Sequence, residues 1–569
     1  MNQITRNQAN STPLTPLTFL DRAATVYGNS ISIIYNSTSF TWFQTHKRCL
    51  QLASSLSSLG IVKGDVVSVL SPNTPAMYEL QFSVPMSGAI LNNLSFRLDY
   101  KTLSALLIHS ESKLIFVDIL SLSLALNALS LFPKNTPSPK LVLIMDETLL
   151  PDQIPSLPKN INIMNTYDYE SLVAKGDPNF KWIRPDTEWD PITLNYTSGT
   201  TSSPKGVVHC HRATFIVSLD SLIDWSVPVQ PVFLWTLQMF HSNGWSYPWG
   251  MAAVGGTNIC TRRTDAPSIY NLIESHGVTH MCAAPVVLNM LSNFNKNEQL
   301  KKPVHVLTGG SSPPAAILIR AENLGFEVSH GYGMTEVIGV IVSCAWKREW
   351  DRFPATGKAR MKARQGVRRV GVTEVDVVGP TGESVKHDGI TAGEIVVKGA
   401  CVMLGYLKDE NATLQCMKKN GWFYTGDVAV MHEDGYLEIK DRLKDVIISG
   451  GENMSSVEVE GVLYMHPAVK EAAVVARPDD FWGETPCAFV SLKDELNEND
   501  IPTDMEIKKF CREELPHFMT PKTIVIMKEL PKTSTGKVKK HVLRKVAKEM
   551  GSTSLPPSQP PSHRLISRI

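Results

Sequence analysis

Helix-like and strand-like segments alternate along the early part of the chain, and this alternation restricts the possible folds more than any other feature of the sequence. Between Pro16 and Met145, apolar residues at helical spacing are separated by the β-rich runs Ile31–Tyr35, Asp65–Leu70 and Lys113–Val117. Such alternation is typical of layered α/β sheets. No fixed-period repeat is visible, which disfavours a solenoid.

Later segments differ in character. Around Val367–Val378 and Gly393–Tyr406, β-branched residues dominate between glycines, which predicts an antiparallel sheet or a small β-barrel. A boundary is expected at Asp441–Lys444, between two strand-like runs. The stretch Ser552–Ser562 is rich in Pro and Ser and cannot bury enough apolar surface to fold. We therefore expect a large α/β domain (1–440), a small α+β domain (441–550) and a flexible tail (551–569).

The composition of the 569 residues is that of a globular protein, with 43% hydrophobic and 20% charged side chains. The formal net charge is +1, which offers no field to attract nucleic acid or an anionic membrane. The nine cysteines include no CxxC pair, so we expect reduced thiols and an intracellular protein. The uncharged stretch Trp225–Thr261 contains seven Pro and Gly residues, which predicts buried loops and not a membrane span.

The segment Tyr196–Gly206 reads YTSGTTSSPKG and follows an apolar run. Its hydroxyls and backbone N–H groups can donate to phosphate oxygens, and Lys205 adds a mobile positive charge. The segment is not a Walker A loop, because the second glycine and the Lys-Ser or Lys-Thr pair are missing. An anion-binding loop and a polar surface turn both remain open for this segment.

A second motif, Gly331–Glu336, reads GYGMTE and is preceded by His330. Glycines allow close backbone approach to a planar ligand, and a carboxylate can hold a divalent cation. A dinucleotide fingerprint is disfavoured because Glu336 replaces its third glycine. The alternative is a tight turn with a structural tyrosine.

Three further motifs are weaker when taken alone. Tyr424–Asp427 (YTGD) and Asp441–Asp445 (DRLKD) offer Asp427 and Arg442 as partners for the hydroxyls of a ribose. Either residue alone would more often be a charged residue in a surface turn. The segment Pro531–Lys537 (PKTSTGK) is by itself only a basic loop.

Taken together and in this order, these strings resemble the adenylate-forming superfamily of acyl-CoA synthetases, luciferases and peptide-synthetase adenylation domains. The similarity extends from Pro13 to about Lys548, and within the superfamily the chain looks like plant acyl-activating enzymes for short-chain, medium-chain and benzoate or cinnamate-type acids. The resemblance implies a mobile C-terminal domain. One departure is Ser202, where many relatives have glycine, so the loop geometry can differ slightly.

The resemblance also implies roles for individual residues. The ATP and AMP contacts would be Thr197, Ser198, Gly199, Thr200, Thr201, Lys205, Gly309, Gly310, Ser311, His330, Gly331, Tyr332, Gly333, Thr335, Asp427 and Arg442. Glu336 and Thr200 would bind Mg²⁺, Lys537 and His241 would be catalytic, and Lys444 would be the hinge. Coenzyme A would contact Ser449, Gly450 and Gly451, and the acyl pocket would comprise His241, Trp245, Pro285, Val286 and Gly309.

The implied activity is that of an ATP-dependent acyl-CoA ligase using ATP, Mg²⁺, coenzyme A and a small carboxylic acid. Other hypotheses are an adenylating enzyme with another acyl acceptor, a luciferase-like oxygenase and a catalytically silent nucleotide or acyl sensor. The C-terminal Ser567, Arg568 and Ile569 resemble a peroxisomal address that an import receptor reads, with the cytosol as the alternative. The sequence predicts neither the particular acid nor the oligomeric state.

Two other clusters invite a function. A basic run comprises Lys358, Arg360, Lys362, Arg364, Arg368 and Arg369, and we interpret it as a solvated face, with a contact for the coenzyme A phosphates as the alternative. In His209-Cys210-His211, strand alternation would point Cys210 away from both histidines, so we predict no metal site there. A lone histidine such as His241 is more often a structural residue than a catalytic one.

Overall fold

The computed structural model describes residues 7–146, 149, 166–197, 204–294, 299–311, 313–442, 444–450, 452–494, 496–497, 500–517, 519–533 and 536–553. The contacts divide the chain into two compact units. The first unit contains Met1–Ile439 together with the short segment Thr533–Lys537. The second unit contains Lys440–Lys532 and Val538–Ile569.

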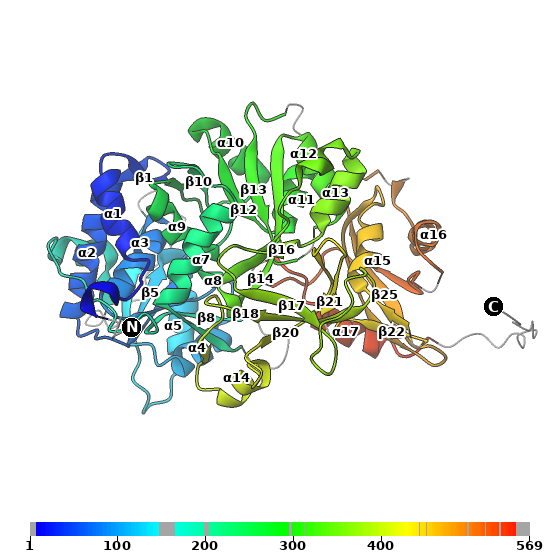
Figure 1. Ribbon diagram of the computed structural model, residues 1–569. Helices are drawn as coiled ribbons and strands as arrows, with labels where there is room; N and C mark the ends of the chain where they lie inside the picture. Colours follow the sequence, from blue (N-terminus) through cyan, green and yellow to red (C-terminus); the bar gives the residue numbers. More distant parts are fainter. Residues whose placement is uncertain are drawn as a thin grey trace, which may run out of the picture. The chain divides into compact units, whose positions relative to one another are not determined.

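An eight-stranded, largely parallel sheet forms one layer of the first unit (Figure 1). Its strands, in spatial order, are β19 (Gly405–Tyr406), β9 (Gly206–Cys210), β8 (Pro191–Tyr196), β4 (Ile90–Asn93), β3 (Val66–Leu70), β5 (Leu114–Asp118), β6 (Lys140–Ile144) and β7 (Thr166–Asp168). The pairs of β9 with β8 and of β9 with β19 are antiparallel, and the other pairs are parallel. Parallel strands need crossover helices on the sheet faces, which explains the alternation in the sequence.

A nine-stranded sheet forms a second layer of the same unit. Its order is β16 (Val367–Arg368), β15 (Gly339–Ser343), β14 (Phe326–Met334), β13 (Val304–Thr308), β12 (His280–Ala283), β10 (Val232–Leu234), β11 (Thr257–Ile259), β1 (Ile31–Tyr35) and β2 (Thr38–Thr41). The strands from β14 to β1 run parallel, and antiparallel pairs close both edges. Figure 1 shows helices α10, α12 and α13 gathered around β12 and β13.

The region predicted as an antiparallel sheet or small barrel is a four-stranded antiparallel sheet. Its order is β17 (Glu374–Val378), β18 (Ala392–Lys398), β20 (Phe423–Met431) and β21 (Leu437–Arg442). Buried valines and isoleucines such as Val377, Ile395 and Val397 pack its inner face with Val337 and Ile338. This packing fixes the sheet beside the end of β14, where the second motif lies.

The helices of the first unit are α1 (Thr18–Val26), α2 (Trp42–Ser58), α3 (Pro75–Met86), α4 (Tyr100–His109), α5 (Leu122–Leu129), α6 (Tyr169–Lys175), α7 (His211–Asp224), α8 (Ser242–Trp245), α9 (Tyr247–Val254), α10 (Ala266–His276), α11 (Pro285–Asn293), α12 (Ala315–Asn323), α13 (Ala355–Ala363) and α14 (Glu410–Cys416). Local chemistry sets several of their starts. At α2, Thr41 Oγ1 accepts from Gln44 N while Gln44 Oε1 accepts from Thr41 N. This reciprocal cap satisfies two backbone donors at the helix start.

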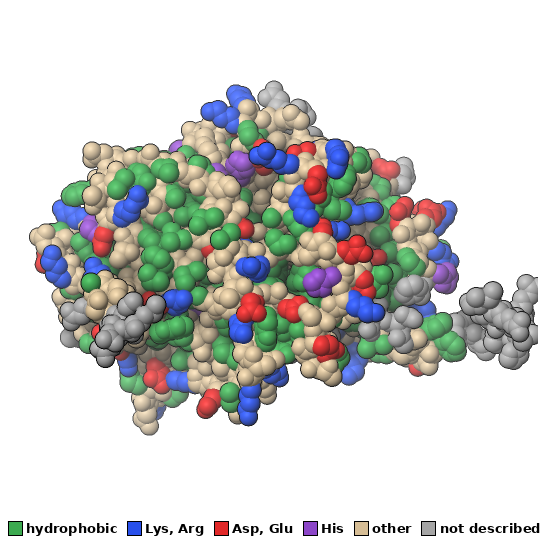
Figure 2. All heavy atoms as spheres, in the orientation of Figure 1, with side chains coloured by type: hydrophobic (Ala, Val, Ile, Leu, Met, Phe, Trp, Pro, Cys, Tyr) green, Lys and Arg blue, Asp and Glu red, His purple; other side chains and the backbone are tan. Residues whose placement is uncertain are grey.

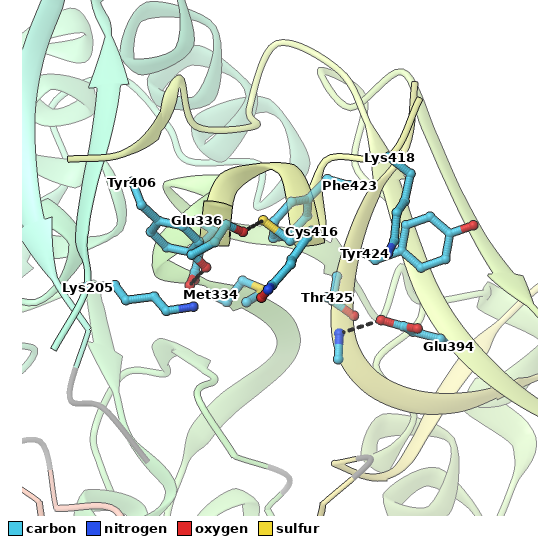
Figure 3. Close-up of a pocket in the computed structure, with 13 residues that line it drawn as sticks. Lys205, Met334, Glu336, Glu394, Tyr406, Cys416, Lys418, Phe423, Tyr424 and Thr425 are labelled. Atoms are coloured by element: carbon cyan, nitrogen blue, oxygen red, sulfur yellow. Dashed lines mark hydrogen bonds between the residues drawn. The ribbon is translucent and has the colours of Figure 1, made fainter. Parts of the chain in front are cut away.

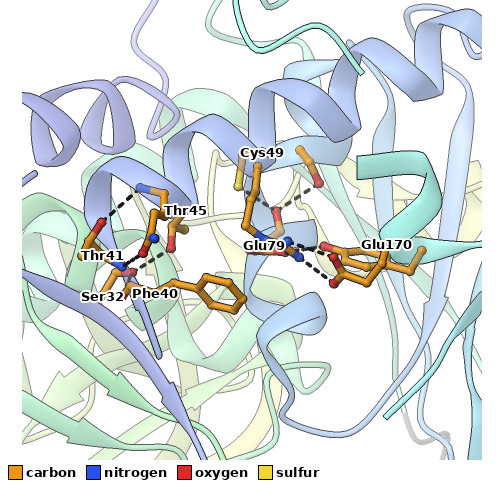
Figure 4. Close-up of polar contacts among 11 residues, drawn as sticks. Ser32, Phe40, Thr41, Thr45, Cys49, Glu79 and Glu170 are labelled. Atoms are coloured by element: carbon orange, nitrogen blue, oxygen red, sulfur yellow. Dashed lines mark hydrogen bonds and ion pairs between the residues drawn. The ribbon is translucent and has the colours of Figure 1, made fainter. Parts of the chain in front are cut away.

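A partly buried ion cluster joins α2, α3 and α6 (Figure 4). The Arg48 guanidinium lies 2.6 Å from the Glu79 carboxylate and 2.7 Å from that of Glu170, and the Tyr169 hydroxyl donates to Glu79 at 2.6 Å. The Arg48 guanidinium also lies over the Phe40 ring, 4.6 Å from the ring centroid. Since Glu79 is fully buried, removing one partner would leave an uncompensated charge, at a cost of about 3–5 kcal/mol. The cluster therefore ties α2, α3 and α6 together.

The second unit packs helices on a small sheet. The sheet order is β23 (Glu452–Met454), β22 (Ile447–Ser449), β25 (Gly483–Leu492) and β24 (Val469–Asp479), with β26 (Thr523–Ile526) parallel to β25. Its helices are α15 (Ser456–Leu463), α16 (Asp504–Glu514) and α17 (Lys540–Glu549). Lys540 pairs with Glu460 at 2.8 Å, and Asp441 accepts from Ser456 N at 2.8 Å. These contacts attach α15 and α17 to the start of the unit.

The fold class expected from the sequence is confirmed, and β1, β3 and β5 match the predicted runs to within one residue. The stretch Trp225–Thr261 is folded as two short strands, the left-handed turn labelled α8 and the helix α9, so it is only partly the loops that were predicted. None of the helices within the described ranges has the length and apolar character needed to cross a bilayer. On the face drawn in Figure 2, basic and acidic side chains are interspersed.

Candidate active site

The predicted phosphate loop connects two paired strands. Strand β8 ends at Tyr196, β9 begins at Gly206, and these two residues are register partners. Thr197 N donates to Lys205 O at 3.0 Å, and Lys205 N donates to Thr197 Oγ1 at 3.3 Å, so both ends of the loop are held together. The predicted contacts Ser198, Gly199, Thr200 and Thr201, and the departure Ser202, lie outside the described residues.

A pocket of about 370 Å³ opens beside the end of this loop (Figure 3). Lys205, Glu336 and Tyr406 lie on one side of it, and Lys418 and Tyr424 lie on the other. The pocket is lined by Lys205, Met334, Glu336, Glu394, Tyr406, Ala412, Gln415, Cys416, Lys418, Phe423, Tyr424, Thr425 and Gly426. The structure therefore brings together the predicted phosphate lysine and the predicted metal carboxylate.

Tyr406 links these two charged groups. Its hydroxyl donates to Glu336 Oε1 at 2.8 Å, and the Lys205 ammonium lies 4.6 Å from its ring centroid. Burial, followed by the negative charge of Glu336, raises the pKa of Tyr406 well above its ordinary value, so the phenol stays protonated as a donor. Sequence reasoning did not assign Tyr406, although it stands in the recognisable pair Gly405-Tyr406.

Glu336 is positioned by a sharp change of direction between β14 and β15. It lies in the 3₁₀ turn η5 (Thr335–Val337), which ends at Ile338 in the left-handed region, φ 54°. His209 Nε2 contacts Thr335 O at 2.7 Å, and burial lowers the pKa of His209 to about 4 against the opposing effect of this hydrogen bond. The neutral imidazole is therefore a fixed donor that supports the turn.

The alternation argument for His209-Cys210-His211 is only partly right. Strand β9 ends at Cys210, and His211 begins α7, so the strand period does not reach it. His211 Nδ1 lies 2.9 Å from Thr15 Oγ1, far along the chain from the Thr335 partner of His209. The two histidines thus serve separate structural contacts.

The glycines of the second motif have a packing role. A Cβ at Gly333 would lie 1.6 Å from Gly339 O, and a Cβ at Gly331 would lie 2.5 Å from Val340 Cγ1. Close approach of β14 to β15 therefore requires both glycines, whatever ligand they also contact. Between them, the Tyr332 hydroxyl donates to Asp427 Oδ2 at 2.7 Å, which fixes the carboxylate predicted to bind ribose.

His330 and Ser311 differ from each other in exposure. His330 lies inside β14 at 2% exposure, and burial lowers its pKa to about 4. Ser311 is exposed, next to Gly310 with φ 87°. Their predicted nucleotide contacts stay predictions.

Lys537 is held by its own loop. Thr533 N donates to Lys537 O at 2.7 Å, and Lys537 N donates to Thr533 Oγ1 at 3.1 Å. The segment Thr533–Lys537 groups with the first unit, although we expected Lys537 within a continuous domain of residues 441–550. A Cβ at Gly310 would lie 3.3 Å from Lys537 Nζ, and burial followed by the charge of Lys537 lowers the pKa of His241 to about 3.

The predicted hinge and coenzyme A residues belong to the second unit. Arg442 and Lys444 are exposed, and Ser449 is buried at the end of β22. Gly450 adopts φ 61°, and a Cβ there would lie 2.6 Å from the Trp482 ring. Gly451 lies outside the described residues, and the ribose pairing of Asp427 with Arg442 stays a prediction because the two residues fall in different units.

Three of the predicted acyl residues, His241, Trp245 and Gly309, lie at or beside a strained turn. Five consecutive residues from Ser242 to Ser246 have φ between 38° and 69°, so they form a short left-handed turn directly after His241. Such conformations cost about 1–2 kcal/mol for each L-residue that is not glycine. Trp245 lies against Gly309, where a Cβ would be 3.3 Å from Trp245 Cη2. Pro285 and Val286 begin α11.

A buried amide network holds this turn. Asn195 Nδ2 donates to Asn243 Oδ1 at 2.6 Å, and Asn243 Nδ2 donates to Gln81 Oε1 at 2.9 Å. Asn93 Nδ2 donates to the same Gln81 oxygen at 3.2 Å, and all four side chains are at most 3% exposed. Sequence reasoning missed this network, because its members come from α3, β4, β8 and the turn and share no local motif.

The basic run is not one solvated face. Arg369 is 1% exposed and lies 3.1 Å from Asp224, next to Asp220, whose pKa is raised by burial. Lys362 pairs with Glu322, and Arg364 lies 3.3 Å from Asp434. The interpretation is therefore wrong for Arg369, which is a buried structural charge.

Comparisons with known proteins assign the fold and the family of this chain. A solved anthranilate CoA ligase in complex with anthranoyl-AMP has the same fold, with a TM-score of 0.81 and 21% identity over 96% of this chain and 99% of that chain. Residues 20–407 match the model of the AMP-binding enzyme family, and residues 458–537 match the model of the AMP-binding enzyme C-terminal domain. The chain belongs to the AMP-binding enzyme family, as the motifs predicted.

Two plant relatives are similar over nearly their full lengths. A 2-methylpropanoate–CoA ligase of Humulus lupulus is 62% identical, over 97% of this chain and 99% of that protein. A probable acyl-activating enzyme 5, peroxisomal, of Arabidopsis thaliana is 62% identical, over 98% of this chain and 100% of that protein.

Proposed function

We propose that this protein is an AMP-forming acyl-CoA ligase. A carboxylate reacts with ATP to give an acyl-adenylate and diphosphate, and the coenzyme A thiol then displaces AMP to give a thioester. The observation that carries the proposal is the 62% identity to a CoA ligase over 97% of this chain. The pocket lined by both Lys205 and Glu336 supports the proposal, because an ammonium and a metal-binding carboxylate suit a nucleoside triphosphate.

The residues at the pocket suit a magnesium–phosphate ligand. Among the described residues, no group of three His, Cys, Asp or Glu side chains could hold a metal by itself. Mg²⁺ commonly takes one or two carboxylates and completes its shell with phosphate oxygens and waters, so the Glu336 carboxylate fits this need. Glu336 and Thr200 would hold the ion, which supplies neutralising charge for the triphosphate.

In the first half-reaction, this chain orients two negatively charged reactants. The loop after β8 and the Lys205 ammonium bind phosphate oxygens, and Asp427, held by Tyr332, binds the ribose hydroxyls. The acid carboxylate attacks the α-phosphorus, and the bond from that phosphorus to the diphosphate oxygen breaks. The Lys537 ammonium neutralises charge that develops on both reactants, which is usually a large contribution to catalysis.

In the second half-reaction, the thiol sulfur bonds to the acyl carbon, the acyl–phosphate oxygen bond breaks, and the thiol proton leaves to solvent or a base. The contacts of Ser449, Gly450 and Gly451 with coenzyme A, the hinge at Lys444 and the placement of His241 at the acyl entrance are part of this proposal. The low pKa of His241 makes its imidazole neutral at physiological pH, which suits a group beside an incoming thiol.

The acyl group is proposed to be short, branched or aromatic. The Trp245 side chain lies against Gly309, where it would limit the depth of an acyl pocket, and the Humulus lupulus relative is named for 2-methylpropanoate. A peroxisomal location is also proposed, in line with the name of the Arabidopsis thaliana relative. The tripeptide Ser567–Ile569 lies outside the described residues, and imaging a fluorescent fusion with and without Arg568→Glu tests it.

The experiment that tests the function measures AMP release from ATP with and without coenzyme A. The acids are acetate, butyrate, isobutyrate, isovalerate, hexanoate, octanoate, benzoate, cinnamate and 4-coumarate. Turnover that needs both an acid and coenzyme A, with a maximum at one acid, is the expected result. AMP release that is equally fast without coenzyme A would favour another acyl acceptor, and no turnover by the folded protein would contradict the ligase.

A further inference from the structure

Tyr406 occupies a position between two charges of opposite sign. Its hydroxyl donates a hydrogen bond to one oxygen of Glu336, and the face of its ring contacts the Lys205 ammonium. Lys205 has no ion-pair partner in the part of the chain that the structure describes. A direct pair between Lys205 and Glu336 would bind both charges to each other, whereas the tyrosine holds each separately at the pocket wall (Figure 3).

The backbone around Tyr406 is fixed to the strand that follows Lys205. Tyr406 pairs with Val207 in the antiparallel contact of β19 with β9. Leu407 N donates to Gly206 O at 2.7 Å, and Tyr406 N donates to Thr413 Oγ1 at 2.9 Å. Tyr406 therefore lies on the strand that pairs with the one following Lys205, so its position relative to that lysine is defined by the register of β19 with β9.

Glu336 is tied to the same segment from the other side. Met403 N donates to Glu336 O at 2.8 Å, three residues before Tyr406. The side chain and the backbone of Glu336 thus both contact the segment from Met403 to Tyr406. A hydrogen bond from a neighbouring side chain to a metal-binding carboxylate fixes the direction in which that carboxylate points.

We propose that Tyr406 is a positioning residue for the magnesium–phosphate end of ATP. Its hydroxyl orients the Glu336 carboxylate for binding the metal ion. Its ring holds the Lys205 ammonium beside the place where the phosphate oxygens would bind. The proposal rests on the proposed function, but its test reads out ATP binding and does not need turnover.

The chain offers a matched control in the same pocket. Tyr424 also lines the pocket and also carries a lysine on its ring, with Lys418 Nζ 5.6 Å from the centroid. Its hydroxyl, however, accepts from Asn420 Nδ2 at 3.2 Å, whereas the Tyr406 hydroxyl donates to a carboxylate. Tyr424→Phe therefore removes a hydroxyl of the same kind without affecting Glu336.

The experiment titrates a non-hydrolysable ATP analogue into the full-length protein at a series of Mg²⁺ concentrations, by calorimetry. Tyr406→Phe should raise the Mg²⁺ concentration for half-maximal binding about tenfold, because it removes a hydrogen bond to a charged group. Binding without Mg²⁺ should stay unchanged. Tyr406→Leu should in addition weaken binding without Mg²⁺ about three- to tenfold through the loss of the ring beneath Lys205.

Two further measurements distinguish positioning from structural support. The Tyr406→Phe change should have almost no effect on Mg²⁺ dependence in a Glu336→Gln background, since it acts through that carboxylate. The KM values for acid and coenzyme A should be unaltered in Tyr406→Phe if the ligase assay succeeds. An unchanged Mg²⁺ requirement, a shift equal to that of Tyr424→Phe, or a uniform loss of binding with a lower melting temperature would each overturn the proposal. If wild type binds the analogue but releases no AMP, the proposed function fails while this test still decides the role of Tyr406.

Discussion

The phosphate side and the acyl side of the candidate site are built differently. Around Lys205 and Glu336 the groups are charged, reach a pocket, and meet through one tyrosine. Around Trp245 the support is a buried amide network on a left-handed turn, with Asn243 fully buried. Charged groups suit ATP, which is the same substrate in every turnover. A tightly packed, strained turn suits discrimination between acids that differ by a few carbon atoms.

Because the two sides are built differently, substitutions on them should affect different measured properties. A change on the phosphate side alters electrostatic stabilisation and should appear mainly in rate and in Mg²⁺ or ATP dependence. A change on the acyl side alters packing and backbone conformation, and it should appear in stability and in the choice of acid.

The largest effect is expected for Lys537→Ala. Loss of the cation should slow acyl-adenylate formation about 10²- to 10³-fold. Thioester formation from supplied acyl-adenylate should stay close to wild type. Single-turnover measurements of both half-reactions provide the check, with Lys545→Ala, an exposed lysine of α17, as the control. Equal loss of both half-reactions would contradict the assigned role.

On the acyl side, Asn243→Ala should lower the free energy of unfolding by about 2–4 kcal/mol. It removes two buried hydrogen bonds and places alanine at φ 39°, where L-residues are disfavoured. Asn243→Gly is the matched control, because it loses the same amide but tolerates the left-handed conformation. Urea denaturation should show glycine less destabilising than alanine by about 1 kcal/mol. Equal destabilisation by the two variants would mean that backbone strain contributes nothing there.

A smaller effect, on selectivity, is expected for Trp245→Gly. Removing the indole opens the space against Gly309, and glycine also accepts the φ of 54° without strain. The ratio of kcat/KM for octanoate to that for butyrate should rise about 10- to 100-fold, in line with the small discrimination that apolar pockets achieve. KM for ATP should not change. An unaltered chain-length profile would remove Trp245 from the acyl pocket.

Local sequence motifs named more residues on the phosphate side than in the amide network of the acyl side, for a physical reason. Loops such as Tyr196–Gly206 carry their chemistry in neighbouring residues, and β1 follows from a local run of β-branched side chains. Tyr406 was missed because its partner Glu336 is 70 residues away, and Asn243 because Gln81 is 162 residues away. The burial of Arg369 was likewise invisible, because its partners Asp220 and Asp224 come from α7.

The smallest effect is expected for the stability of the folded protein at acid pH. It should involve both sides of the site, because each contains a buried neutral histidine. Burial lowers the pKa of His209 to about 4 on the phosphate side and, with Lys537, that of His241 to about 3 on the acyl side. An unfolded histidine has a pKa of about 6.5, so the unfolded chain binds protons between pH 6.5 and 4 that the folded chain does not. The free energy of unfolding should therefore fall as the pH falls through this range.

His211 tests this linkage without touching either side. Burial lowers its pKa to about 4, and its Nδ1 contacts Thr15 Oγ1, a hydrogen bond that glutamine can replace. His211→Gln should reduce the dependence of the unfolding free energy on pH by up to about one proton between pH 6.5 and 4. Urea denaturation at pH 7, 6, 5 and 4.5 measures the slope, with the exposed His517→Gln as the control. A slope that is the same in His211→Gln and wild type would mean that this imidazole is already charged in the folded protein, and the same reasoning would then lose force for His209 and His241.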